Sequence, residues 1–257
     1  TVTDQIIGAR EGKLKALYII GEDPMRSDPN INHVRQGLEA LDFLVVHELF
    51  MTPTAEMADV VLPVACFAED EGTFTNSERR VQLIRQAVEP IDGTRKNSDI
   101  LFEVAQRMGA TGWEHKEPAE VWDELARLSP LFAGINYARI EKVGLQWPCP
   151  DTSHPGTPYL HKGTFTRGRG KLHAIEHRPP AEVPDEEFPW FLSTGRIRFH
   201  YNVGTMSRRT TLLDREFPRM FVQIHPADAE RIGVRPGDRV KVSTRRGELV
   251  VEPDITD

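Results

Sequence analysis

The stretch Ala16-Leu-Tyr-Ile-Ile-Gly-Glu-Asp-Pro24 decides the fold class of this chain, because an unbroken apolar run is followed directly by a glycine and two carboxylates. Two later runs, residues 43–46 and 59–62, are also apolar without alternation. Short runs of this kind are typical of strands covered on both faces, as in a parallel sheet. The first part of the chain is therefore predicted to be α/β.

Helices are expected between and after these strands. The apolar residues of segment 31–41 (Ile31, Val34, Leu38 and Leu41) share one helical stripe, which predicts a strand–helix–strand unit with a right-handed crossover. A helix is predicted over 98–108 with Ser98 as its N-cap, and another over 118–128, opened by Pro118. These helices are interpreted as scaffold.

The second half of the chain has a different composition. Residues 147–187 are rich in proline, glycine and basic residues without any period, which indicates a long connection between domains. The predicted domains are thus an α/β domain over 1–146, this connecting segment, and a β-barrel domain over 188–257. The elements expected in the last domain are strands at 190–193, 220–224, 240–244 and 248–252 and a helix at 226–232 stopped by Gly233.

Composition limits the class of protein. The chain has 257 residues, 39% of them hydrophobic, a formal net charge of −7 and a pI near 5.8. This acidic balance argues against a general nucleic-acid binder, which needs a broad basic face. No apolar run reaches the ~20 residues of a membrane-spanning helix, and the first residues lack a signal-peptide pattern. We expect no nucleic-acid partner and no membrane span.

The two cysteines, Cys66 and Cys149, lack CxxC spacing, so neither a disulfide framework nor a zinc or iron–sulfur site is predicted. A reducing, cytoplasmic location is expected. Cys66 lies in an apolar stretch and is interpreted as a small core residue rather than a nucleophile. Thr1 stands where an initiator Met would be, and we expect the chain to be a piece of a longer or processed protein.

Residues 193–209, called the ligand loop below, concentrate hydrogen-bond donors directly after an apolar run. Arginines, a histidine and hydroxyl groups around one crevice suit a large, polar ligand that carries phosphate. The alternative is a basic surface turn that is merely solvated.

Polar side chains also follow the predicted strands, where an open parallel sheet binds its ligands. Gly21 permits close backbone approach and Asp23 offers a carboxylate, while His47 and Glu48 end the second strand. A carboxylate here can accept hydrogen bonds from the edge of guanine or from a ribose diol. Each residue could equally form a turn or cap a helix.

A dense acidic segment follows the third strand at residues 68–80. Adjacent carboxylates such as Glu69, Asp70 and Glu71 cannot all point at one ion, so no metal site is assigned. The segment is interpreted as a polar loop, since charge runs are usually solvated.

Several motifs together resemble a known family. They are Leu17-Tyr-Ile-Ile-Gly-Glu-Asp-Pro24, Phe50-Met-Thr-Pro-Thr-Ala-Glu-Met-Ala-Asp-Val-Val-Leu-Pro63, Glu69-Asp-Glu-Gly-Thr-Phe-Thr-Asn76, Thr194-Gly-Arg196 with His200 and Gly204-Thr-Met206, and His225-Pro-Ala-Asp-Ala229. In this order they look like the C-terminal half of molybdopterin oxidoreductases of the dimethyl sulfoxide reductase family. Within it, Trp147-Pro-Cys-Pro-Asp-Thr152 and Trp122-Asp-Glu-Leu125 are most similar to formate dehydrogenase alpha subunits.

The resemblance implies a specific cofactor, a molybdenum or tungsten ion held between two molybdopterin guanine dinucleotides. It implies an α/β dinucleotide domain followed by a double-psi-like β-barrel that continues beyond a point equivalent to Asp257. It also implies which residues contact the cofactor. They are Gly21, Asp23, His47, Glu48, Asp70, Asp99, Thr194, Gly195, Arg196, His200, Tyr201, Asn202 and Thr205.

The resemblance places the chemistry elsewhere. The family's metal ligand, catalytic residues and [4Fe-4S] motif precede the matching region, so no catalytic or metal-ligating residue is expected in this chain. The implied reaction is oxidation of formate to carbon dioxide, and the implied partners are the remainder of the alpha subunit and electron-transfer subunits. Two alternatives stay open: a non-catalytic structural relative in an electron-transfer complex, and a reductase of nitrate or another oxyanion.

Overall fold

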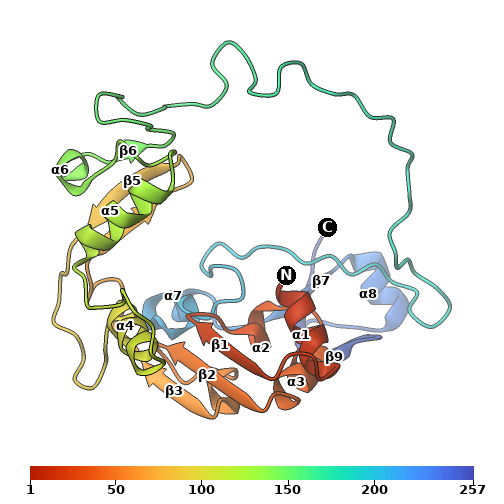
Figure 1. Cartoon of the computed structure of the whole chain (residues 1–257). Coiled ribbons are helices and arrows are strands. Elements are labelled where there is room, and N and C mark those ends of the chain that lie inside the picture. The colour runs from red at the N-terminus through yellow and green to blue at the C-terminus, as the bar shows by residue number, and fades with distance from the viewer. The chain divides into compact units, whose positions relative to one another are not determined.

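The computed structural model describes residues 1–257 and divides into two compact units. Unit 1 comprises Thr1–Val61 and His177–Asp257, and unit 2 comprises Leu62–Glu176. Figure 1 follows the chain from red at α1 to blue at β9. None of its helices combines the length and the apolar character that crossing a membrane requires.

The first sheet has the order β1–β2–β3. β1 (Ala16–Ile20) and β2 (Phe43–Glu48) pair in parallel, with Ile20 opposite His47, and β3 (Val60–Pro63) follows β2 in the sheet. The predicted parallel pairing of the first two apolar runs is confirmed. The carboxyl ends of β1 and β2 therefore lie side by side.

Two helices of unit 1 pack closely on one another. α1 (Val2–Arg10) contacts α3 (Ile31–Glu39), and a Cβ added at Gly37 would lie 2.7 Å from Ile6 Cγ2. A glycine is therefore required where these helices meet. A short helix, α2 (Pro24–Ser27), precedes α3.

The predicted inward stripe of α3 is correct for Val34 and Leu38, which are buried, and wrong for Ile31, the first residue of the helix, which is 46% exposed. The buried core of this unit draws on α1, α2, α3, β2 and the 3₁₀ helix η1 (Ala55–Met57), and Leu17 and Ile19 of β1 pack against it partly buried. Its buried members are Ile6, Met25, Val34, Leu38, Leu44, Val46 and Ala55.

The C-terminal sheet of unit 1 has the order β7–β9–β8. β7 (Phe221–Ile224) pairs in parallel with β9 (Gly247–Ile255), which pairs antiparallel with β8 (Val240–Thr244). α8 (Pro226–Ile232) ends at Gly233 with φ +76°, as predicted. The expected β-barrel is not present as a closed barrel, because these three strands form an open sheet.

The predicted strand over 190–193 is absent. Residues 147–206 contain no helix or strand and run as coil in green to cyan in Figure 1. Phe191 and Leu192 are 81% and 56% exposed and pair with no strand. Two short elements, η2 (Ser207–Arg209) and α7 (Thr211–Glu216), follow the coil.

Unit 2 contains a sheet that sequence reasoning missed. β4 (Gly72–Thr75) and β5 (Arg80–Ile84) form an antiparallel hairpin, and β6 (Leu145–Gln146) adds to β5. The interpretation of 68–80 as a polar loop is therefore wrong for β4. The turn depends on Asn76, whose side-chain oxygen accepts hydrogen bonds from the backbone N–H groups of Glu78 and Arg80.

The helices of unit 2 are α4 (Asn97–Arg107), α5 (Pro118–Leu128) and α6 (Tyr137–Ile140). α5 starts at Pro118 as predicted. α4 starts one residue before Ser98, with Lys96 as its N-cap, so the predicted cap is wrong. A buried apolar cluster of this unit comprises Val81, Trp122, Ile135, Ile140 and Cys149.

Candidate functional site

The end of β1 places a carboxylate in the protein interior. Gly21 has φ +63°, and its N–H donates to the carbonyl of His47 over 3.0 Å, so the chain turns sharply beside the end of β2. Two residues later Asp23 is only 4% exposed. The polar residues predicted at the ends of the first two strands are therefore brought together.

Only one carboxylate oxygen of Asp23 is hydrogen-bonded. Its Oδ1 accepts from the hydroxyl of Thr54 at 2.6 Å and from the backbone N–H of Thr54 at 3.3 Å. Its Oδ2 is buried without a hydrogen bond, although Arg26 Nε lies 3.5 Å away in an ion pair. A buried acceptor without a donor costs about 1–3 kcal/mol, so Oδ2 is suited to accept from a ligand.

The neighbouring strand end holds a tyrosine–histidine pair. Tyr18 Oη lies 2.6 Å from Nε2 of His47, which is fully buried. Burial raises the pKa of Tyr18, so the phenol keeps its proton and can donate to the imidazole. Glu48 is 8% exposed, and its Oε1 accepts from the backbone N–H of Leu49 at 2.7 Å.

Unit 2 gathers the two remaining predicted carboxylates around a lysine. Lys96 Nζ lies 2.9 Å from Asp70 Oδ1, and this hydrogen bond raises the pKa of Lys96, with smaller contributions from the charges of Asp70, Asp99 and Glu71. Lys96 was not predicted as a site residue. Its place directly before the first turn of α4, three residues before Asp99, is the sequence feature that could have indicated a role beside this carboxylate.

Asp99, in the first turn of α4, repeats the pattern seen at Asp23. Its Oδ1 is buried and has no hydrogen bond, while the side chain as a whole is 32% exposed. His115 Nδ1 lies 3.3 Å from this oxygen and forms an ion pair only when protonated. Asp23 and Asp99 belong to different units, so their convergence on one crevice stays a prediction.

The first part of the ligand loop is open to solvent. Thr194, Gly195 and Arg196 are exposed. One guanidinium nitrogen of Arg196 donates to Asn202 Oδ1 at 2.7 Å, and Asn202 has a left-handed φ of +50°. This hydrogen bond folds the loop back on itself and leaves the other donors of Arg196 free to bind an anion.

The second part of the ligand loop is held by a buried histidine. His200 Nε2 lies 2.8 Å from the carbonyl oxygen of Phe217, and its Nδ1 lies 3.3 Å from Ser207 Oγ. A carbonyl can only accept, so Nε2 carries the proton in this contact. Both ring nitrogens of His200 are therefore engaged within the protein.

Two other predicted contacts in the ligand loop differ in exposure. Tyr201 is 80% exposed, whereas Thr205 is partly buried. At the end of the loop the guanidinium of Arg209 lies over the ring of Phe50, 4.4 Å from its centroid. Phe50 follows Glu48, the last residue of β2, by two positions. The ligand loop and the end of β2 are thus in contact within unit 1.

The described residues contain no group of three or more His, Cys, Asp or Glu side chains placed to hold a metal ion. Both cysteines are free. Cys149 is buried, whereas Cys66 is only partly buried, so its interpretation as a core residue is corrected. The arrangement offers carboxylate acceptors and arginine or lysine donors, which suits a polar organic ligand with phosphate groups.

Comparisons with known proteins identify the family. Residues 1–107 match the family model described as molybdopterin oxidoreductase, and residues 191–257 match the molydopterin dinucleotide binding domain. The chain belongs to the molybdopterin oxidoreductases. This confirms the family inferred from its motifs.

Named relatives of this molybdopterin oxidoreductase are formate dehydrogenases. The chain is 47% identical to F420-dependent formate dehydrogenase 2 subunit alpha of Methanococcus maripaludis over 95% of its length, and 45% identical to the F420-dependent formate dehydrogenase subunit alpha of Methanocaldococcus jannaschii over 95%. It spans 37% of the length of each relative. Among solved structures, acetylene hydratase from Pelobacter acetylenicus has the same fold, with a TM-score of 0.72 and 21% identity over 99% of this chain and 37% of that one.

Proposed function

We propose that this chain holds guanine dinucleotide portions of a bis-molybdopterin guanine dinucleotide cofactor within a formate dehydrogenase alpha subunit. One observation carries the proposal. Asp23 and Asp99, two residues assigned to the cofactor from sequence, each retain a buried carboxylate oxygen without a hydrogen bond.

These oxygens fit the chemistry of the ligand. Guanine presents an N1–H and an exocyclic amine on one edge, and ribose presents hydroxyl donors, whereas a carboxylate is purely an acceptor. An unpaired buried acceptor is unfavourable in the protein alone and becomes favourable when a donor arrives. A guanosine therefore supplies donors of the kind that Asp23 and Asp99 can accept from.

Cationic groups would hold the phosphates. The guanidinium of Arg196 can present paired donors to a pyrophosphate oxygen, and Asn202 orients it by accepting from one of its nitrogens. His200 would act indirectly, by fixing the fold of the ligand loop through Ser207 and Phe217. Lys96 would add positive charge beside Asp70 and Asp99.

The chemical step belongs to the parent protein. When bound, the cofactor would supply a two-electron redox centre for oxidation of formate, the substrate indicated by the names of the relatives. The residues of this chain would bind and orient the cofactor. A molybdenum or tungsten ligand, a [4Fe-4S] cluster and electron-transfer subunits would belong to the rest of that assembly.

The test measures guanine nucleotide and metal released from the denatured full-length parent. We expect both in the wild type, and loss of guanine nucleotide in the double variant Asp23→Asn/Asp99→Asn. The control is Glu22→Gln/Asp123→Asn, since both residues are exposed and neither has a side-chain partner. A parent that carries no guanine dinucleotide would overturn the proposal and favour a structural relative. Turnover of nitrate rather than formate by the loaded parent would overturn the assigned substrate.

A further inference from the structure

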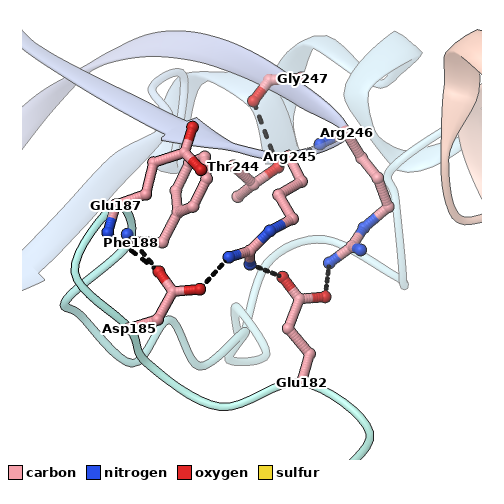
Figure 2. Close-up of polar contacts among 8 residues, drawn as sticks. All are labelled: Glu182, Asp185, Glu187, Phe188, Thr244, Arg245, Arg246 and Gly247. Atoms are coloured by element: carbon pink, nitrogen blue, oxygen red, sulfur yellow. Dashed lines mark hydrogen bonds and ion pairs between the residues drawn. The ribbon is translucent and has the colours of Figure 1, made fainter.

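Two arginines of the β8–β9 turn bind the coil that precedes the ligand loop (Figure 2). Arg245 Nη1 donates to Glu182 Oε1 at 2.8 Å, and Arg246 Nη2 donates to Glu182 Oε2 at 2.6 Å. Arg245 also donates through Nη2 to Asp185. We call these four side chains the ionic tether. Each oxygen of Glu182 takes a different arginine, so the tether is a network rather than an isolated pair.

The ionic tether also fixes the local turn of the coil. Asp185 Oδ1 accepts from the backbone N–H groups of Glu187 at 3.0 Å and Phe188 at 2.8 Å. The guanidinium of Arg245 lies over the ring of Phe188, 4.5 Å from its centroid. One arginine therefore contacts two carboxylates and an aromatic ring of the same segment, an arrangement that a lysine could not reproduce.

Electrostatics favour the charged state of the network. The hydrogen bond from Arg246, followed by that from Arg245, lowers the pKa of Glu182. The backbone hydrogen bond from Phe188, with a smaller contribution from Arg245, lowers the pKa of Asp185. These side chains are between 36% and 49% exposed, so salt should screen their attraction.

The ionic tether lies at one end of the ligand loop. After Phe188, the ring of Trp190 stacks under Arg231, 4.4 Å from the guanidinium carbon. At the far end, His200 binds Ser207 and Phe217 inside unit 1. The coil before the ligand loop is therefore held by exposed ionic contacts and the second part of the loop by buried hydrogen bonds, and the exposed residues 194–196 lie between them.

We propose that Arg245 is a positioning residue for the ligand loop. By fixing residues 182–188 to the β8–β9 turn, it sets the place of Thr194–Arg196 relative to the part held by His200. The inference rests on the proposed function, because the loop is taken to bind the cofactor. Arg245 acts through the tether and does not contact the ligand. Retention of the cofactor should consequently depend on ionic strength through the start of the loop.

The experiment measures backbone hydrogen exchange and bound guanine nucleotide in the full-length parent. For Arg245→Gln we expect faster exchange in residues 182–199, unchanged exchange in 200–217, and several-fold lower retention of guanine nucleotide during gel filtration. Salt at 0.5 M should produce the same pattern in the wild type. For Arg245→Lys, both the exchange rate in residues 182–199 and the retention of guanine nucleotide should lie between those of the wild type and Arg245→Gln. The control is Arg239→Gln, a residue without an ion pair just before β8, which should match the wild type.

The outcomes separate this proposal from the proposed function. Unchanged exchange in 182–199 would show that no tether operates and would overturn the positioning role. Faster exchange with unchanged retention would overturn it too, because the tether would then be structural only. A uniform rise in exchange across both segments would point to general destabilisation and would likewise contradict it. If wild-type parent holds no guanine nucleotide, the proposed function fails first, and the positioning role fails with it.

Discussion

Asp23 and Glu69 are both almost completely buried carboxylates, 4% and 5% exposed, yet their oxygens are treated differently. In unit 2, Glu69 Oε2 accepts from the backbone N–H of Cys66 at 2.8 Å and Oε1 accepts from that of Ile91 at 3.0 Å. In unit 1, Asp23 Oδ2 accepts from nothing. Burial alone therefore does not distinguish the two carboxylates. The oxygen without a hydrogen bond does, and it is the reason why we propose that Asp23 binds a ligand.

The largest expected effect is at Asp23. Asp23→Asn keeps an oxygen that can accept from Thr54 but replaces the free acceptor by an amide donor. Retention of guanine nucleotide in the full-length parent should fall roughly 10- to 150-fold, the loss of a charge-assisted hydrogen bond. The melting temperature of the cofactor-free parent should change little, because Thr54 keeps its acceptor and the ion pair that is lost is with Arg26, whose side chain is 42% exposed.

The control for this prediction is Glu22→Gln, which changes an exposed carboxylate one residue away. Glu22→Gln should alter neither the retention of guanine nucleotide nor the melting temperature. A lower melting temperature for cofactor-free Asp23→Asn would mean that Asp23 is structural like Glu69. It would contradict the proposed difference between the two carboxylates.

Substitution of Asp99 should also lower the retention of guanine nucleotide, but by a smaller factor than substitution of Asp23. Its side chain is 32% exposed, so water and His115 can compensate for a lost partner. For Asp99→Asn we expect retention to fall about 2- to 10-fold, the range of an ordinary hydrogen bond. Asp123→Asn on α5 is the matched control. Retention equal to that of Asp123→Asn would remove Asp99 from the site.

Arg196 extends the comparison to a cation whose donors are only partly used. Arg196→Lys keeps the charge but loses the paired donors of the guanidinium. We therefore expect retention of guanine nucleotide to fall about 2- to 5-fold, which is within the range expected for loss of one neutral hydrogen bond. The melting temperature should change by no more than the effect of about 0.5 kcal/mol typical of exposed positions. Release of guanine nucleotide from the denatured variant measures the first quantity, and a thermal scan the second. Retention at the wild-type level would favour a solvated turn.

The smallest effect on the ligand is expected at Glu69, where the pH dependence of stability is informative. The hydrogen bond from the Cys66 backbone, and that from Ile91, lower the pKa of Glu69. A carboxylate with a lowered folded pKa stabilises the fold above its unfolded pKa, near 4.3, and loses this contribution as the pH falls through the folded value. Glu69→Gln should lower the melting temperature at pH 7, flatten its decline below pH 4.3, and leave retention unchanged.

Sequence patterns correctly predicted the helix ends that depend on the backbone angles of single residues. Pro118 opens α5 and Gly233 ends α8, because proline and glycine impose backbone angles at those positions. The hairpin of β4 and β5 was missed because Asn76 forms its turn by side-chain hydrogen bonds, and because the residues of β6 that pair with β5 lie 64 and 66 positions further along the chain. The residue type of Ser98 predicts an N-cap, yet α4 begins at Asn97 without any side-chain cap.

The site shows the same division. Sequence placed Asp23 and His47 at strand ends, which the parallel register of β1 and β2 brings together. It could not reveal that Thr54 saturates one oxygen of Asp23 and leaves the other free, because that contact joins residues 31 apart. Nor could it give the inward role of His200, which depends on the carbonyl of Phe217.

The division of the chain into units has a consequence for its synthesis. Unit 2 is one uninterrupted segment, whereas unit 1 is assembled from the first 61 residues and the last 81. As the polypeptide leaves the ribosome, the intervening unit is complete while β1 and β2 still await the segment that carries the ligand loop. Contacts of such long sequence separation form slowly and leave apolar surface uncovered in the meantime. The nascent first segment is therefore where we expect chaperones to be needed most.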